Sequence, residues 1–246
     1  MATAVGIVIF TLIILMAYLL RNPQFIGYAG ESIIRRRLSS LPRGEYHALH
    51  NLLVPREDGK RTQIDHVVVS PYGVFVIETK NYQGIIVGKD EWKEWTQVLN
   101  RRTKHRFLSP VVQNEGHIRA LGHAVPELPR SAFRSIVAFN DKARLDVESQ
   151  KAEVVHFRHL AKAIRAHRDV LIPAETVNLV VERLQSADIK GDKARQEHIK
   201  GIREMKRQLA ANICPRCGGE LRIRKGQRGE FYGCSNYPRC RFTRPV

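Results

Sequence analysis

Apolar residues recur along the chain with two different periods, which predicts a mixed α/β protein. Apolar neighbours three or four residues apart predict helices over 28–41, 114–121, 159–167 and 174–185. Short runs rich in branched apolar residues predict strands over 46–53, 64–69, 74–79, 133–139 and 153–157, with further strands over 81–87 and 91–99. Polar segments such as "PREDGKRTQ" and "PYG" separate the strands and predict turns.

A continuous apolar segment precedes this region. Residues 2–20 carry no charged side chain, and a helix of about twenty residues can cross the hydrocarbon core of a bilayer. We therefore expect a transmembrane signal anchor over residues 2–21. A cleaved signal peptide is the alternative, but such a peptide normally has a basic stretch before its apolar run, and here there is none. Arginines follow from Arg21 onward, so the positive-inside rule predicts a single-pass protein of the inner (cytoplasmic) membrane, with its N-terminus outside and its body in the cytoplasm.

The same patterns divide the rest of the chain into four segments. We expect a core domain over 25–140, its C-terminal helices over 141–187, a basic helical linker over 188–212 and a small module over 213–246. The linker has an apolar stripe that includes Ile199 and Met205 in an otherwise charged segment. It is either an element that couples the two domains or a solvated helix that only spaces them.

The charge of the chain narrows the choice of partners. The formal net charge is +17, and a surface with such an excess attracts polyanions, namely nucleic acid or an anionic membrane face. The apolar and charged fractions, 43% and 26%, are ordinary for a globular protein and exclude a disordered chain.

All the cysteines lie near the C-terminus, at Cys214, Cys217, Cys234 and Cys240. Clustered spacing of this kind is typical of a metal site and of a reducing compartment, whereas a disulfide framework usually spreads its cysteines through a fold. Four thiolates complete a tetrahedral zinc site and leave no open position for catalysis. We therefore expect a structural zinc ion whose binding supplies the folding free energy of the module.

The stretches "CPRCGGEL" and "GEFYGCSNYPRCRFT" resemble the four-cysteine zinc ribbon at the C-terminus of bacterial type IA topoisomerases. The resemblance implies binding of single-stranded DNA. Aromatic side chains could stack on bases, and basic side chains could follow the phosphates. The residues expected to make these contacts are Arg222, Arg224, Lys225, Phe231, Tyr232, Tyr237, Arg239, Arg241 and Phe242. Some of the aromatic residues must also build the small core, and the sequence alone does not separate the two uses.

Charged residues flank two of the predicted core strands in "IDHVVVSPYGVFVIETK". Asp65 opens one strand, and Glu78 and Lys80 end the next, two residues apart and therefore on one face. Carboxylates suit Mg²⁺, and a neighbouring lysine can orient the attacking water or neutralise a phosphate. The pattern thus predicts a site for metal-dependent phosphodiester cleavage. His66 is expected to point to the opposite face and to be structural.

Three stretches, "GE" at 30–31, the 64–84 block and "SPVVQNEGHIRAL" at 109–121, together resemble the nuclease-related domain (NERD). The resemblance implies a restriction-endonuclease-like mixed sheet flanked by helices. The fold class expected for the whole chain is therefore α/β, with an N-terminal transmembrane helix and a small C-terminal zinc ribbon. The resemblance also implies site roles, with magnesium held by Glu31, Asp65 and Glu78, Lys80 as the catalytic lysine and Gln113 as a polar residue on a helix.

Three functions remain open. The first is a membrane-anchored, Mg²⁺-dependent DNA nuclease whose ribbon captures single-stranded or frayed DNA. The second is a catalytically inactive protein that tethers nucleic acid at the inner membrane. The third is an envelope protein whose basic surface binds anionic lipid. The basic segment 101–106 could meet DNA phosphates in the first two cases.

Overall fold

The computed structural model describes residues 23–226 and 229–245. The chain divides between Ile189 and Lys190 into two compact units, which we describe separately. The predicted membrane anchor over 2–21 lies outside the described residues. Within the residues that are described, no helix combines the length and the apolar character that crossing a membrane requires.

The first unit alternates strands and helices along the chain. In order, its elements are α2 (Pro23–Leu38), β1 (His47–Pro55), β2 (Arg61–Ser70), β3 (Gly73–Lys80), β4 (Gly84–Lys89), β5 (Glu94–Val98), β6 (Lys104–Leu108), α3 (Pro110–Ala124), β7 (Phe133–Phe139), β8 (Ala143–Glu148), β9 (Glu153–His156), α4 (Leu160–Ala166) and α5 (Ala174–Ala187). Short 3₁₀ turns cover Arg130–Ala132 and Phe157–His159.

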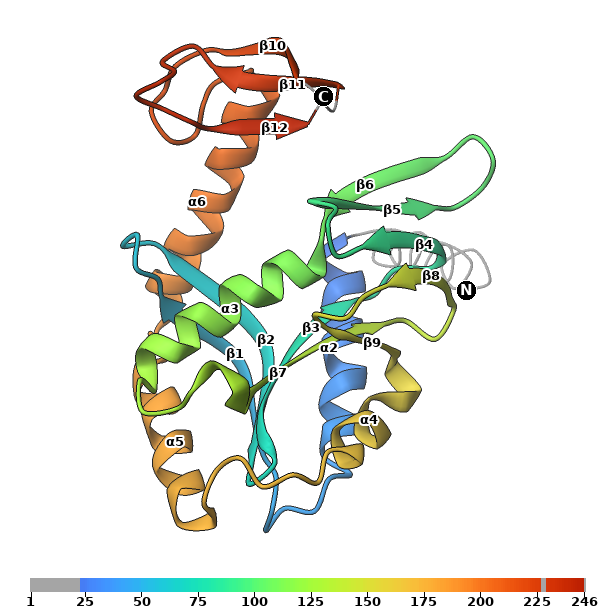
Figure 1. The fold of residues 1–246 in the computed structure, drawn as a ribbon, viewed down its shortest axis with the longest axis vertical. Helices are drawn as coiled ribbons and strands as arrows, with labels where there is room; N and C mark the ends of the chain where they lie inside the picture. Colours follow the sequence, from blue (N-terminus) through green and yellow to red (C-terminus); the bar gives the residue numbers. More distant parts are fainter. Residues whose placement is uncertain (1–22, 227–228, 246) are drawn as a thin grey trace, which may run out of the picture. The chain divides into compact units, whose positions relative to one another are not determined.

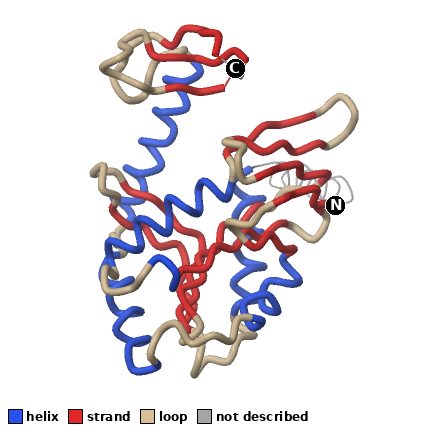
Figure 2. Tube along the Cα trace, in the orientation of Figure 1, coloured by secondary structure: helices blue, strands red, loops and turns tan. Residues whose placement is uncertain are grey.

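A five-stranded sheet with the order β1-β2-β3-β7-β9 forms the centre of this unit. Strands β1 to β3 are antiparallel neighbours, whereas β3, β7 and β9 run parallel. Helices α3 and α5 cover one face and helices α2 and α4 cover the other (Figures 1 and 2). Alternation along β3 feeds both layers, because Val74 and Val76 pack under α3 and α5 while Phe75 and Ile77 pack under α2 and α4.

A second sheet, ordered β6-β5-β4-β8, continues the parallel pair at the centre of the first sheet. Lys80 pairs with Phe139 at the end of β3, and Gly84 pairs with Ala143 at the start of β4, so the offset is the same 59 residues in both sheets. At the break between them, the backbone N–H of Asn140 donates to the carbonyl of Lys80 (3.1 Å), and the side chain of Asn140 donates to that of Asn81. We call this interruption the sheet break. It leaves Lys80 at the end of a paired strand.

The predicted fold class is confirmed at the level of mixed α/β sheets flanked by helices. Two strands, β6 and β8, were not predicted. The segment predicted as an edge strand over 91–99 contains β5, which lies between β6 and β4 and is not an edge. The strand predicted over 81–87 is β4 and belongs to the second sheet. The predicted helix over 28–41 is α2, and it ends three residues earlier, at Leu38.

The second unit consists of helix α6 (Asp192–Ala210) and a three-stranded antiparallel sheet. Its strands are β10 (Leu221–Gly226), β11 (Gly229–Cys234) and β12 (Thr243–Pro245). The small core contains three buried cysteines and Leu221, against which Leu209, Tyr232 and Phe242 pack. The core is too small to be independently stable without a metal ion.

Candidate functional site

Asp65 lies where the antiparallel pairing of the central sheet stops. The ladder between β2 and β3 ends at the pair His66 and Ile77. Instead of a further backbone bond, the backbone N–H of Thr79 donates to Oδ2 of Asp65 at 2.9 Å. This bond fixes the Asp65 carboxylate beside the end of β3.

Asn51 faces Asp65 at an irregularity in the neighbouring strand. Its φ of 55° breaks the alternation of β1, and the pairing of β1 with β2 passes over it. In the amide orientation that satisfies both neighbours, Asn51 donates to Oε2 of Glu31 at 3.0 Å and accepts from Arg35 at 2.8 Å. Asn51 thus ties the carboxylate of helix α2 to the sheet near Asp65.

Glu31 reaches the sheet because helix α2 crosses the sheet break at very short range. A Cβ atom on Gly30 would lie 2.8 Å from Cβ of Asn81, closer than side-chain atoms normally approach. Glycine at this position therefore permits the close contact that carries Glu31 to the end of β3.

Glu78 and Lys80 form a buried ion pair on the face of the sheet covered by α3. Lys80 Nζ donates to Oε1 of Glu78 at 2.6 Å, and their side chains are 15% and 5% exposed, respectively. The other carboxylate oxygen of Glu78, Oε2, lies 3.5 Å from Nδ1 of His117 on α3. This distance is long for a hydrogen bond, and Nδ1 has no other partner among the described residues. His117 was not predicted as part of the site.

Helix α3 is held over this site by Asn114. Its buried side-chain amide donates to the carbonyl of Val76 (2.7 Å), to Oγ of Ser135 (3.0 Å) and to the carbonyl of Ile136 (3.3 Å). The predicted Gln113 is half-buried one turn before His117, on the same side of the helix. The "QNEGH" segment therefore turns both Gln113 and His117 to one face, and only His117 is close to Glu78.

Electrostatic interactions join these groups into one cluster. Burial raises the pKa of Asp65 to about 8, and the Glu78 carboxylate contributes to this shift. Burial also raises the pKa of Glu31, again with a contribution from Glu78. The pKa of Lys80 is raised although its burial opposes the charged form, because Glu78 lies against its ammonium group. Three acidic groups thus share one ammonium, and an additional cation would relieve their repulsion.

His66 lies on the other face of β2 from this cluster. Its side chain is fully buried, and its Nδ1 lies 2.9 Å from Nδ1 of His50. Burial lowers the pKa of His66 to about 3, so the ring is neutral at physiological pH. A role within the packed layer under α2 accounts for it.

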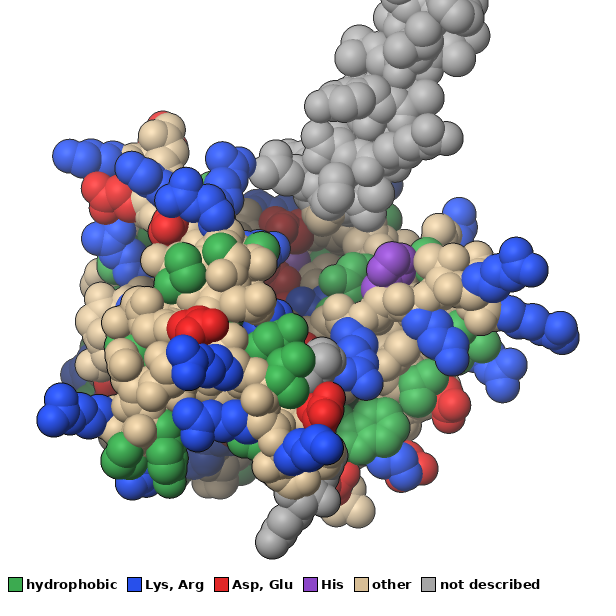
Figure 3. All heavy atoms as spheres, turned by 90° about the horizontal axis from the view of Figure 1, so that it is seen from above, with side chains coloured by type: hydrophobic (Ala, Val, Ile, Leu, Met, Phe, Trp, Pro, Cys, Tyr) green, Lys and Arg blue, Asp and Glu red, His purple; other side chains and the backbone are tan. Residues whose placement is uncertain are grey.

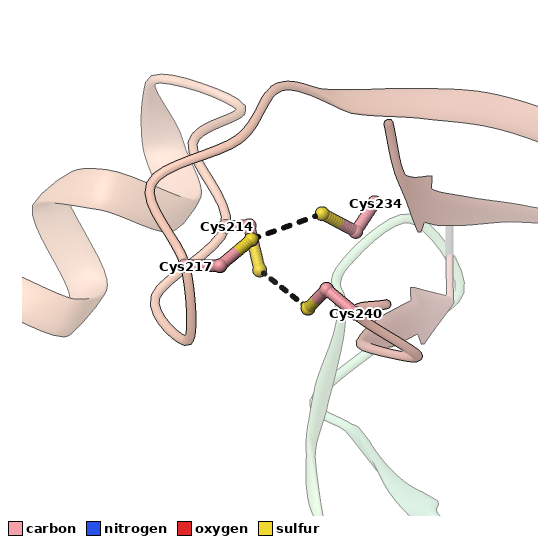
Figure 4. A group of neighbouring side chains, drawn as sticks. All are labelled: Cys214, Cys217, Cys234 and Cys240. Carbon is pink, nitrogen blue, oxygen red and sulfur yellow. Dashed lines mark hydrogen bonds between the residues drawn. The ribbon is translucent and has the colours of Figure 1, made fainter. Parts of the chain in front are cut away.

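The four cysteines of the second unit converge as the sequence predicts (Figure 4). All four sulfur atoms lie within 4.8 Å of one another, with 3.7 Å between Cys214 and Cys240 and 3.3 Å between Cys217 and Cys234. Tetrahedral zinc with Zn–S bonds of about 2.3 Å places its sulfurs about 3.8 Å apart. The cysteines therefore fit a structural zinc ion.

Further contacts prepare the sulfurs for a cation. Asn236 donates from its backbone to Cys234 and from its side chain to Cys217, each at 3.4 Å. The backbone N–H of Gly219 lowers the pKa of Cys217 to about 6, and Cys234 contributes to this shift. In the described ranges, the cysteines are the only group of three or more histidine, cysteine or acidic ligand atoms with this close spacing. The oxygens of Glu31, Asp65 and Glu78 are farther apart.

The two faces of the ribbon sheet separate the predicted nucleic-acid contacts. Tyr232 and Phe242 pack against the cysteine core, and the guanidinium of Arg244 lies 4.2 Å from the centre of the Tyr232 ring. These rings build the module. Lys225 alternates with Arg222 and Arg224 along β10, so it points to the other face from these two arginines.

The opposite face has two aromatic rings beside a flat backbone. Arg224 pairs across the sheet with Phe231, and a Cβ atom on Gly233 would lie 2.9 Å from Cδ of Arg224. The Arg224 side chain therefore lies across Gly233, and its guanidinium is 5.8 Å from the centre of the Tyr237 ring. Tyr237 is 61% exposed. Arg222, Arg239 and Arg241 are also exposed.

The fold and the two sites define a class of protein in which a nuclease-like α/β core is joined to a small zinc-binding module. Residues 26–140 match the nuclease-related domain, and residues 211–246 match the topoisomerase DNA binding C4 zinc finger. An uncharacterized protein of Bacillus anthracis is 36% identical over 182 residues, which cover 72% of this chain and 84% of that protein. The chain therefore belongs to the family of proteins with a nuclease-related domain, and it carries a topoisomerase-type four-cysteine zinc ribbon at its C-terminal end.

The ribbon has relatives of its own. It is 59% identical over 34 residues to DNA topoisomerase 1 of Methanocaldococcus jannaschii and 61% identical over 31 residues to DNA topoisomerase 1 of Campylobacter jejuni. These matches cover 14% and 13% of this chain and only 4% of either topoisomerase. The similarity to topoisomerases is thus confined to the ribbon.

Proposed function

We propose that this protein is a membrane-anchored DNA-binding protein that hydrolyses phosphodiester bonds with Mg²⁺. The observation that carries the proposal is the cluster at the sheet break, where Glu31, Asp65, Glu78 and Lys80 come together from one helix and two strands. Buried acidic groups that raise one another's pKa are costly to the fold, and such clusters occur at functional sites. The match to a nuclease-related domain supports the same reading.

The carboxylates of the cluster would hold the magnesium ion. Oxygen ligands suit Mg²⁺, which commonly keeps several of its waters and is held by only one or two carboxylates. Asp65 and Glu78 would be direct ligands, and Glu31 would act directly or through a water because the three groups are not in mutual contact. When bound, the ion would stabilise negative charge on the phosphoryl group and lower the pKa of a bound water.

Lys80 would act as a cation and not as a base. Its ammonium is held in the charged form by Glu78, so it has no free electron pair with which to take a proton. It would neutralise the oxygens of the attacked phosphate. In the reaction, a water oxygen bonds to phosphorus, the bond from phosphorus to the leaving sugar oxygen breaks, and the proton lost by the water is balanced by one gained at the leaving oxygen.

The ribbon would capture single-stranded or frayed DNA. Phe231 and Tyr237 supply the stacking surfaces, because Tyr232 and Phe242 are occupied in the core. Arg222 and the exposed arginines near Cys240 would follow the phosphates. The apolar segment 2–21 would anchor the protein in the inner (cytoplasmic) membrane, with both DNA-contacting units in the cytoplasm.

A cleavage assay with two variants tests the proposal. Purified full-length protein in detergent, incubated with Mg²⁺ and labelled single- or double-stranded DNA, should cleave, and Glu78→Ala and Lys80→Ala should each lower the rate at least about 100-fold. Asp169→Asn, which changes an exposed carboxylate elsewhere, should cleave normally. Equal rates for all four proteins would identify a contaminating nuclease.

Binding without turnover is the second candidate function. It is favoured by the spacing of the acidic oxygens, which are farther apart than the zinc ligands, and by the ion pair that occupies Glu78. Salt-sensitive DNA binding by a protein that cleaves no DNA at any Mg²⁺ or Mn²⁺ concentration would establish this function and reject the nuclease.

A further inference from the structure

Strands β5 and β6 form a basic hairpin at the free edge of the second sheet. We call residues 94–108 the arm. Its outer strand, β6, pairs only with β5 among the described strands, and the hairpin extends beyond the neighbouring strands in Figure 1. Lysine and arginine side chains project from the same end of the molecule in Figure 3. The basic residues of the arm are Arg101, Arg102, Lys104, His105 and Arg106.

Most of this charge is uncompensated. Arg106 lies 4.0 Å from Glu94 across the hairpin, whereas Arg101, Arg102 and Lys104 are exposed and pair with no carboxylate in the part of the chain that is described. Like charges gathered this closely repel one another, so the arrangement favours a polyanionic partner.

The base of the arm is fixed next to the acidic cluster. Phe107 meets Tyr82 edge to face, with ring centres 4.9 Å apart, and Tyr82 follows Lys80 by two residues. The indole of Trp95 is buried under the same strands and donates to the carbonyl of Lys89 at 3.1 Å. The arm therefore starts at the rim of the acidic cluster and cannot swing freely about its base.

Composition distinguishes the arm from the ribbon. Between residues 99 and 106 the arm has no aromatic side chain, and Phe107 is engaged by Tyr82. Surfaces that hold single strands combine basic groups with aromatic stacking platforms, so the arm lacks half of that chemistry. A two-stranded β-ribbon with positive charge instead fits the major groove and the backbone of a duplex.

We propose that the arm grips the phosphate backbone of duplex DNA beside the acidic cluster. The inference rests on the proposed function in naming DNA as the partner. Five residues of extended strand reach about 17 Å, and DNA carries one phosphate per strand every 3.4 Å or so, so the arm spans about five base pairs. The duplex would be held by the arm, while the ribbon would take a single-stranded end.

The salt dependence of binding tests this role without requiring cleavage. Full-length protein in detergent and without Mg²⁺ is titrated with a labelled 30-base-pair duplex, or with an unpaired 30-nucleotide strand, between 50 and 200 mM salt. Each lost phosphate contact lowers the slope of log affinity against log salt by about 0.9 for a duplex. The triple variant Arg101→Ala, Arg102→Ala, Lys104→Ala should therefore lose about 2.7 of slope on the duplex and keep its slope on the single strand.

A matched triple variant controls for net charge. Arg158→Ala, Lys162→Ala, Arg165→Ala removes the same charge from exposed positions at α4, which packs on the opposite face of the central sheet from α3. It should leave the duplex slope within about 0.5. Equal losses in the two triple variants would overturn the proposal, as would a loss confined to the single strand.

Two further results separate this inference from its neighbours. A duplex-specific loss of slope in a wild-type background that cleaves no DNA would support the arm and reject the nuclease. Vesicles with 30% anionic lipid provide the other comparison. If the arm variant lost binding to these vesicles but kept its duplex slope, the arm would be a membrane contact and the proposal would fail.

Discussion

Asp65→Asn separates the structural cost of the acidic cluster from its use. The asparagine keeps an oxygen that accepts the hydrogen bond from Thr79 and removes the carboxylate that repels Glu78 and Glu31. We therefore expect the metal-free variant to be more stable than the wild type at pH 8. Added Mg²⁺ should reverse this order, because only the wild type gains a ligand charge to offer the ion.

The magnitude follows from the pKa of Asp65, which rises from 3.8 to about 8. Between these values the folded protein binds more protons at this site than the unfolded chain, so stability falls as the pH rises. At about 1.4 kcal/mol per pKa unit the upper limit is about 6 kcal/mol at pH 8. The carboxyl is only partly buried and interacts with Glu78, so we expect about 2 kcal/mol at pH 8 and less than about 1 kcal/mol at pH 4.5.

Thermal unfolding followed by tryptophan fluorescence measures this difference in the core alone, because both tryptophans, Trp92 and Trp95, lie in the first unit. About 2 kcal/mol corresponds to a rise of roughly 4–8 °C in Tm for a domain of this size. Asp169→Asn, at an exposed position, is the matched control and should not change Tm. A metal-free Asp65→Asn that melts below the wild type at pH 8, or equal Mg²⁺ stabilisation of both proteins, would refute the reasoning.

Three other changes test particular contacts. Gly30→Ala should lower the stability of the core by about 1–2 kcal/mol despite a better helix former, because its Cβ meets Asn81; an unchanged fluorescence Tm would contradict this. Phe231→Ala should weaken binding to a single strand about tenfold with the zinc content unchanged, whereas Tyr232→Ala should lower the stability of the ribbon; the reverse pattern in zinc and binding measurements would show that the two faces are wrongly assigned. Cys240→Ser should abolish zinc binding and leave the fluorescence transition of the core in place, and a lost core transition would show that the two units do not fold separately.

Much of the acidic cluster could be predicted from the sequence because its members adjoin one β-hairpin. The two-residue spacing of Glu78 and Lys80 puts them on one face whatever the surrounding fold. His117 could not be placed in this way. Its approach to Glu78 depends on the docking of α3, which Asn114 sets through bonds to three different groups of the sheet. The only local signal was its position one turn after Gln113.

The strands that were missed differ in how visible they are. Strand β8 alternates regularly, with Ala143, Leu145 and Val147 inward and charged residues between them, so its pattern was readable. Strand β6, "KHRFL", has one half-buried residue, Phe107, among exposed ones. It is a strand because β5 pairs with it and Tyr82 contacts Phe107. Such tertiary support leaves no periodic pattern in the sequence.

The constant offset on either side of the sheet break limits how this chain can vary. Inserting one residue into either connection, 81–83 or 140–142, would slide β4 against β8 by one position. Every side chain of the slipped strand would then turn to the other surface, and Ile86 or Ala143 would leave the apolar cluster around Trp95. The two connections are therefore expected to lengthen or shorten only as a pair.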